Sequence, residues 1–191
     1  MLDVTVHEGA VDLWGMVNSE EEKKAAHIAI EVIPGVQGVN NHLMIPPLGY
    51  GVIYADKGVV SPLCYGCIQT TAKMRTGERL VAIFTEISAL LQKYPPNCIA
   101  MEKLFFAKNV TSAMSVSEVR GVILLAAQQR QIPVIEYTPN QVKQAITGSG
   151  RADKRQVQEM ICRLLHLDAV PKPDDAADGL SIALCHIHVM R

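Results

Sequence analysis

Two acids near the C-terminus have the type and spacing that suit a metal ion. Asp175 and Asp178 lie three residues apart in the segment from Pro173 to Leu184, which is otherwise mostly apolar. If a helix begins near Pro173, both carboxylates project from one face of its first turn. Acids are also stabilised at a helix N-terminus by about 0.3–1 kcal/mol each, because unpaired N–H groups lie there. Two interpretations therefore stay open, an ordinary helix start and an oxygen-ligand site for a hard divalent cation.

A third acid ends an apolar segment that has the character of a strand. The segment from Asn97 reads Asn-Cys-Ile-Ala-Met and ends at Glu102, where a purely structural strand would gain nothing from a carboxylate. The following residues contain Phe105 and Phe106 between two lysines. An aromatic stacking surface beside positive charge is typical of proteins that hold unpaired or distorted nucleic acid. Phe105 is the candidate for stacking, and burial in the core is the alternative for either ring.

Four motifs occur in order along the rest of the chain. They are Leu-Gly-Tyr-Gly-Val-Ile at 48–53, Ala-Met-Glu-Lys-Leu-Phe-Phe-Ala-Lys-Asn at 100–109, Glu-Tyr-Thr-Pro-Asn-Gln-Val-Lys-Gln at 136–144 and Asp-Asp-Ala-Ala-Asp-Gly-Leu-Ser-Ile-Ala at 174–183. With these motifs, residues 47–191 resemble the RuvC family of Holliday-junction resolvases. The resemblance implies an α/β, ribonuclease-H-like fold with a mixed five-stranded sheet flanked by helices. It also implies a homodimeric endonuclease for four-way junction DNA in recombination and repair, with the RuvA and RuvB branch-migration proteins as partners.

Phosphodiester hydrolysis by two metal ions needs carboxylates that hold the ions about 3.5–4 Å apart. Glu102, Asp175 and Asp178 supply three such groups and are the expected catalytic residues and Mg²⁺ ligands. The resemblance implies two Mg²⁺ ions per site, with Mn²⁺ as a substitute. The family's fourth group, an aspartate in an Asp-Pro-Gly turn after the first strand, is absent from this chain.

The first 46 residues have a different pattern. Alternating residues on each side of Glu8-Gly9 predict a hairpin, and Ser19 to Glu22 form a capping box at the start of a helix. Together with a strand from Val36 to Ile45, this order resembles the latter part of a BON domain. We therefore expect a small α+β appendage at 1–46 that replaces the first strand of a nuclease domain at 47–191.

Loss of a central strand leaves its neighbours with unpaired backbone groups, which cost about 1–3 kcal/mol each when buried. The segment from Gly38 to Ile45 is the nearby candidate to fill the gap and complete the sheet. An ungapped count from Gly49 puts His42 at the position of the missing aspartate, and a shift of one residue puts Asn41 or Leu43 there. His42 is therefore either a substitute ligand or a side chain that faces solvent or a neighbouring strand.

The formal charge of −1 excludes a bulk attraction to DNA, so a DNA-binding surface must be a local patch. Candidate residues for this patch are Lys103, Lys108, Lys143, Arg151, Lys154 and Arg155. Lys143 and Lys154 match basic positions that the resemblance puts near the scissile phosphate. The alternative for each is an ordinary solvated side chain.

The remaining segments predict a hairpin around Asp56-Lys57-Gly58 and helices over Arg79 to Tyr94 and Val110 to Arg130. The resemblance implies that the second of these helices lies at the dimer interface, with simple burial as the alternative. Cys64 and Cys67 form a lone C-x-x-C without a second pair, which argues against a zinc site. The sequence shows no signal peptide and no membrane span, so we expect a cytoplasmic protein.

Two functions from different classes follow. The first is a metal-dependent endonuclease that resolves four-way junctions. The second is a catalytically impaired junction-binding dimer, in which the altered N-terminal part has removed one essential ligand.

Overall fold

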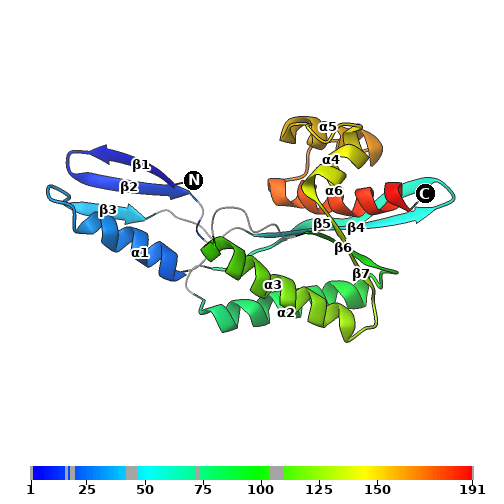
Figure 1. Ribbon diagram of the computed structural model, residues 1–191, viewed down its shortest axis with the longest axis horizontal. Helices are drawn as coiled ribbons and strands as arrows, with labels where there is room; N and C mark the ends of the chain where they lie inside the picture. The colour runs from blue at the N-terminus through cyan, green and yellow to red at the C-terminus, as the bar shows by residue number, and fades with distance from the viewer. Residues whose placement is uncertain are drawn as a thin grey trace. The chain divides into compact units, whose positions relative to one another are not determined.

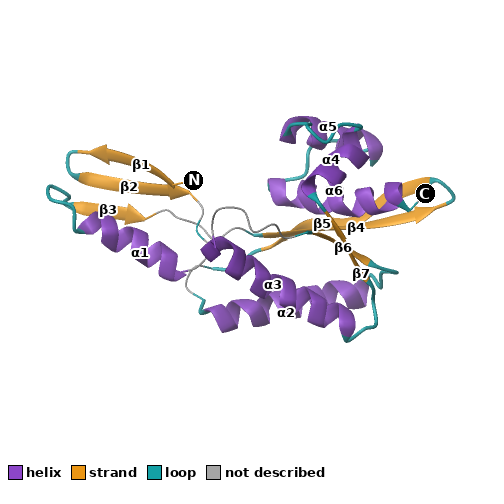
Figure 2. Ribbon diagram, in the orientation of Figure 1, coloured by secondary structure: helices purple, strands orange, loops and turns teal. Residues whose placement is uncertain are grey.

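The computed structural model describes residues 2–15, 17, 20–41, 47–71, 74–103 and 110–190. The chain divides into two compact units, one of residues 1–46, 69–84 and 106–122 and the other of residues 47–68, 85–105 and 123–191. Figure 1 labels the elements along the chain, and Figure 2 separates helices from strands. None of the described helices is both long and apolar enough to cross a membrane.

The N-terminal part of the first unit is a three-stranded sheet with one helix. Strands β1 (Leu2–His7) and β2 (Ala10–Gly15) form the predicted antiparallel hairpin. Its turn residues Glu8 and Gly9 have φ of 49° and 84°, the two positive values that a tight hairpin turn with the right twist requires. Helix α1 (Glu20–Glu31) leads to strand β3 (Gly38–Asn41), which pairs in parallel with β2.

The pairing of β3 contradicts one prediction. Gly38–Asn41 does not lie in the nuclease sheet, because its partners are Ala10–Leu13 of β2. The reason is that the apolar side of β3 is already buried within the N-terminal part. Val39 packs there against the core formed by Val11, Leu13 and Val17. In addition, β2 and β3 are close in sequence and are joined by α1, so β3 reaches β2 without a partner from the distant nuclease segments. Residues 42–46, with His42 and Leu43, lie outside the described residues.

The second unit contains two ladders of two strands each. Strands β4 (Leu48–Asp56) and β5 (Val59–Ile68) form the predicted hairpin, with Lys57 and Gly58 at φ of 45° and 89°. Strands β6 (Ile99–Glu102) and β7 (Val134–Tyr137) are parallel, and Glu102 is opposite Tyr137. Among the described residues, these two ladders are not joined into one continuous sheet. The strand that would lie between these two ladders is the family's first strand, which we expect this chain to lack.

Five further helices complete the described chain. Helices α2 (Thr76–Lys93) and α3 (Val110–Gln128) match the predicted segments to within a few residues. Helix α4 (Pro139–Thr147) starts at a capping box of Thr138 and Gln141, and α5 (Lys154–Leu164) starts at a second one of Asp153 and Gln156. Helix α6 (Asp174–Val189) starts after Pro173, as the acid spacing predicts.

Helix α6 packs directly on β4 because three glycines remove side chains from the contact. A Cβ on Gly51 would lie 2.8 Å from Leu180 Cα, and a Cβ on Gly49 would collide with the Asp175 carbonyl. On the helix side, a Cβ on Gly179 would collide with the Tyr50 backbone. The Gly-Tyr-Gly motif and the glycine after Asp178 therefore set how close the acidic start of α6 comes to the hairpin. Leu180 and Leu184 are fully buried below this contact.

Candidate active site

Glu102 and Asp178 come from separate elements, and the charge of Asp178 acts on Glu102. Glu102 ends β6, and Asp178 lies one turn into α6. Both side chains keep contact with solvent, and both are partly desolvated. Desolvation raises the pKa of Glu102, and the negative charge of Asp178 raises it further. The pKa of Asp178 is also raised, mainly by desolvation. Two carboxyl groups that resist ionisation side by side are typical of a cation-binding or catalytic site.

Asp175 belongs to the same electrostatic neighbourhood. Its charge raises the pKa of Asp178, and after desolvation it is the largest cause of the raised pKa of the Cys67 thiol on β5. Among the described residues, however, no group of three His, Cys, Asp or Glu side chains is arranged to hold a metal ion. In this part of the chain the three predicted carboxylates are linked in pairs, because the charge of Asp178 raises the pKa of Glu102 and the charge of Asp175 raises that of Asp178.

Lys154 pairs with two of the acids at the start of α6. Its ammonium lies 3.4 Å from Asp174 Oδ2 and 3.5 Å from Asp178 Oδ2. Desolvation lowers the pKa of Lys154, but the charges of Asp178 and Asp174 outweigh it and raise the pKa overall. The same contact lowers the pKa of Asp178 against the stronger effect of desolvation. The capping box at Asp153 fixes this geometry, because it makes Lys154 the first residue of α5.

Sequence reasoning missed a second ion pair at this place. Lys172 Nζ lies 3.0 Å from Asp174 Oδ1, and this hydrogen bond is the largest cause of the lowered pKa of Asp174. Asp174 thus accepts from two lysines, whereas Asp178 accepts from one. A signal was present in the sequence, since Lys172 comes two residues before Asp174 and only Pro173 separates them.

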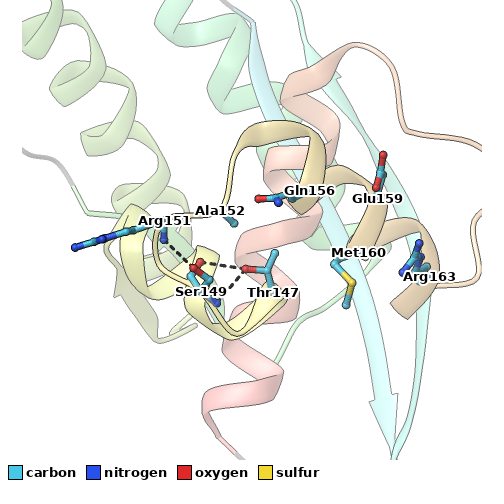
Figure 3. A pocket seen from close by; sticks show the side chains of 8 residues that line it. All are labelled: Thr147, Ser149, Arg151, Ala152, Gln156, Glu159, Met160 and Arg163. Atoms are coloured by element: carbon cyan, nitrogen blue, oxygen red, sulfur yellow. Dashed lines mark hydrogen bonds between the residues drawn. The ribbon is translucent and has the colours of Figure 1, made fainter.

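The other predicted DNA-binding residues are distributed around α4 and α5. Lys143 is half-buried on α4, and Arg151 lies in the turn that joins α4 to α5. This turn borders a hollow of about 520 Å³, and Figure 3 shows Arg151 and Arg163 at opposite sides of it. Ser149 Oγ accepts a hydrogen bond from the Arg151 backbone N–H at 3.3 Å, which orders the turn.

Three predicted site residues cannot be compared with the structure. Phe105 and Lys108 fall in residues 104–109, and His42 falls in residues 42–46, all of which lie outside the described residues. The roles assigned to these three residues stay predictions.

The residues present fit a divalent cation only in part. Mg²⁺ commonly takes one or two protein carboxylates together with water and substrate phosphate. Glu102 and Asp178, with raised pKa values and partial solvent contact, meet that requirement for one hydrated ion. A cation would also relieve the repulsion that raises the pKa of Glu102. The described residues offer no third carboxylate in the same position.

Comparison with known proteins gives two separate matches along the chain. Residues 38–186 match the family described as Crossover junction endodeoxyribonuclease RuvC, and residues 2–47 match the BON domain. The two matches overlap at residues 38–47, which include β3. Both resemblances predicted from the sequence are thus confirmed.

Two bacterial relatives illustrate the similarity. The Crossover junction endodeoxyribonuclease RuvC of Pseudothermotoga lettingae is 51% identical over 142 residues, which cover 74% of this chain and 88% of the relative. The protein of the same name from Desulfitobacterium hafniense is 50% identical over 141 residues, which cover 74% of this chain and 86% of the relative.

Solved structures agree with the sequence relatives. The Thermus thermophilus RuvC structure aligns with a TM-score of 0.70 and 34% identity, over 75% of this chain and 88% of that one. T. thermophilus RuvC in complex with a Holliday junction substrate aligns with a TM-score of 0.72 and 35% identity, over 76% of this chain and 88% of that one. The ribonuclease-H-like fold expected from the sequence is confirmed by these alignments.

Proposed function

The chain belongs to the RuvC family of crossover junction endodeoxyribonucleases, and from this premise we propose that it resolves four-way DNA junctions. Its reaction is hydrolysis of a phosphodiester bond in each of two opposing strands of the junction. The T. thermophilus relative was solved with a Holliday junction substrate, which supports junction DNA as the substrate of this chain as well.

The observation that carries the proposal is the electrostatic coupling of Glu102 to Asp178. Two acids that are 76 residues apart in sequence lie close enough for the charge of one to raise the pKa of the other. Without a ligand, this arrangement opposes folding to a small extent, because two negative charges are brought together and partly desolvated. A cost of this kind is common at sites where a cation or a reacting group relieves it.

RuvC-family nucleases depend on divalent metal ions. In this chain Glu102, Asp175 and Asp178 are the residues that would hold such an ion, with Mg²⁺ as the expected ion, two ions per site as in the family and Mn²⁺ as a substitute. A bound cation supplies water activation and charge stabilisation at the phosphate. The protein's part is to hold the two acids on a strand end and a helix start, which are rigid elements.

Basic and aromatic residues would position the DNA. Lys154 lies beside Asp178 and would meet a phosphate there, and Lys143 would meet the backbone from α4. Arg151 in the α4–α5 turn and Lys108 would extend the patch. Phe105 would stack on unpaired bases at the branch point, a contact that is worth about 1–3 kcal/mol per base.

Because the family's first aspartate is absent, the alternative function is a catalytically impaired junction-binding dimer. The relatives at about 50% identity are named endonucleases, which favours the resolvase. Because one carboxylate is absent, we expect weak cleavage with Mg²⁺. If His42 substitutes for it, Mn²⁺ should restore part of the activity, since imidazole suits Mn²⁺ better than Mg²⁺.

Partners follow from the same premise. We infer a homodimer, because a junction presents two equivalent strands for cleavage, and the RuvA and RuvB proteins as partners that move the branch point. Junctions form in chromosomal DNA and the relatives are bacterial, so the proposed function implies action in the cytoplasm.

The test is cleavage of a labelled four-way junction, followed on denaturing gels with Mg²⁺ and with Mn²⁺. Glu102→Gln should abolish cleavage while junction binding, measured by gel shift, stays nearly intact. Glu159→Gln is the matched control, because Glu159 pairs with Arg155 on the exposed side of α5 and should not affect cleavage. Equal cleavage by the parent and the Glu102→Gln chain would contradict the proposal.

A second variant tests the missing ligand. His42→Asp restores a carboxylate at the position expected from the motif count, and it should raise Mg²⁺-dependent cleavage above that of the parent. Strong Mg²⁺-dependent cleavage by the parent chain itself would contradict the idea that a ligand was lost. Asp56 and Asp174 would then be the first acids to replace, and Asp174 shares the Lys154 ammonium with Asp178.

A further inference from the structure

A cysteine, a histidine and a tyrosine form a hydrogen-bonded chain near the end of α6. Cys98 Sγ lies 2.9 Å from His186 Nε2, and His186 Nδ1 lies 2.8 Å from the Tyr137 hydroxyl. Cys98 comes immediately before β6, Tyr137 ends β7, and His186 lies in the last turn of α6. Neither Cys98 nor His186 has a role in the proposed cleavage, since the proposed acids lie at the end of β6 and the start of α6.

The direction of the two hydrogen bonds depends on the tautomer of His186. Desolvation raises the pKa of the Cys98 thiol and of the Tyr137 hydroxyl, so both keep their protons near neutral pH. A neutral imidazole has one donor and one acceptor nitrogen. In the tautomer with a proton on Nδ1, the thiol donates to Nε2 and Nδ1–H donates to the Tyr137 oxygen. In this arrangement Nε2 is a base in contact with a thiol proton.

The imidazole of His186 is held between the Cys98 thiol and the Tyr137 hydroxyl. Tyr137 is almost fully buried, with 4% of its surface exposed, and it holds the ring in place through Nδ1. A nucleophile, a base within about 2.6–3.2 Å and a third group that orients the base form the recurring pattern of an activated nucleophile.

The other four cysteines lack such a base. Cys64 Sγ donates to the Tyr50 hydroxyl over 3.9 Å, and Cys185 Sγ donates to the Gln141 carbonyl over 3.8 Å. Cys185 is fully buried, whereas Cys98 is partly exposed. The pKa of the Cys67 thiol is raised by desolvation and then by the charge of the nearby Asp175, which is an acid and not a base. Within the described residues, which include all five cysteines, Cys98 alone has an imidazole nitrogen in contact.

The geometry points to Cys98 as a covalent modification site for small electrophiles, with His186 as the base and Tyr137 as the residue that positions it. With a haloacetamide, the sulfur attacks the methylene carbon and displaces the halide. The thiol proton passes to His186 Nε2, and a carbon–sulfur bond replaces the carbon–halogen bond. No oxidant or further reactant is needed. This assignment is independent of the proposed cleavage of junctions.

The experiment measures the alkylation rate of each cysteine in the native chain. The protein is treated with limiting iodoacetamide at neutral pH, and the modified peptides are quantified by mass spectrometry over time. Cys98 should react at least about tenfold faster than Cys162 and Cys185, because base catalysis typically contributes more than this factor. In urea, where the contacts are lost, the five rates should become similar. Native rates for Cys98 equal to or below those of Cys162 would overturn the inference.

Variants separate the base from simple accessibility. His186→Gln keeps a polar side chain of similar reach without a base, and it should slow Cys98 about tenfold while the Cys162 rate stays the same. Tyr137→Phe removes only the orienting hydroxyl and should cause a smaller loss at Cys98. A faster rate at Cys98 in His186→Gln would show that the imidazole shields the thiol rather than activates it, and would equally overturn the inference. If the His186 variant does not fold, the parent rates and the Tyr137 variant still decide.

Discussion

Lys154 Nζ lies 3.5 Å from Asp178 Oδ2, so a residue predicted to contact DNA neutralises a residue predicted to bind metal. A lysine ammonium and a hydrated divalent cation therefore compete for one carboxylate. The two side chains are each about half exposed, at 55% and 54%, which keeps the ion pair weak.

Removal of the competing ammonium should strengthen metal binding. Lys154→Met should bind Mn²⁺ about two- to fivefold more tightly, since exposed ion pairs are worth about 0.2–1 kcal/mol. Isothermal titration calorimetry on the DNA-free chain measures the affinity. Arg155→Met, which breaks the pair with Glu159 on the same helix, is the control and should leave the affinity unchanged. Weaker Mn²⁺ binding by the Lys154 variant would contradict the competition.

The raised pKa of Glu102 predicts a pH dependence of stability. The folded carboxyl group holds its proton more tightly than the unfolded one, so its contribution favours folding at low pH. That contribution is lost as the pH rises from the ordinary value of 4.5 through the raised pKa. Glu102→Gln should therefore unfold at a slightly higher temperature than the parent at neutral pH, by no more than about 2 °C. Thermal melts between pH 4 and pH 8 check this, and the difference should disappear at the acid end.

A divalent cation bound at Glu102 should also stabilise the fold, because it offsets the negative charge of this carboxylate. Mn²⁺ in excess should raise the melting temperature of the parent and should raise that of Glu102→Gln less, because one ligand is gone. Equal shifts in both chains would show that the cation acts elsewhere.

Close contact between α6 and β4 predicts a cost for any side chain at Gly51. Gly51→Ala puts a Cβ 2.8 Å from Leu180 Cα and should destabilise the fold by about 1–3 kcal/mol. Gly77→Ala is the matched control, since a Cβ there meets nothing within 4 Å and lies in helix α2. The control should be neutral or stabilising by up to about 1 kcal/mol. Chemical denaturation of both variants measures the difference, and equal stabilities would contradict the role given to the glycine.

Lys143 should contribute to DNA binding without sequence preference. If its ammonium contacts a phosphate, Lys143→Met should weaken binding equally for all junction sequences and lower the salt slope by about one unit. Gel shifts at several salt concentrations measure the slope. Lys24→Met, on the exposed side of α1, removes the same charge away from the nuclease residues and should leave the slope unchanged.

Local signals predicted most of the elements. The turns at Glu8-Gly9 and Lys57-Gly58 have positive φ at both positions. The glycine at the second position of each turn is the signal in the sequence that predicts such a turn. The acids after Pro173 likewise marked the start of α6. The pairing of strands that are distant in sequence was harder to predict. Gly38–Asn41 has the alternation of a strand, but alternation does not name a partner, and β2 of its own module was available.

The site shows the same division. Glu102 and Asp178 were recognised because their motifs match a family, and the fold brings them together. The link from Lys154 to Asp178 and the contact of Cys98 with His186 join residues 24 and 88 positions apart, and no local pattern announces either. Such contacts follow from how α5 packs on α6 and α6 packs on the strands, which is information that the sequence carries only through the whole fold.

The separation of the β4–β5 ladder from the β6–β7 ladder has a consequence for assembly. With β3 committed to β2, the described part of the nuclease unit keeps β4 and β6 as edge strands, whose backbone N–H and C=O groups can accept another strand. In donor-strand complementation, an unpaired strand edge of this kind is completed by a strand from another chain. A synthetic peptide with the sequence of the missing strand, aspartate included, would find hydrogen-bonding partners on both ladders. Its binding would deliver a carboxylate from outside the chain.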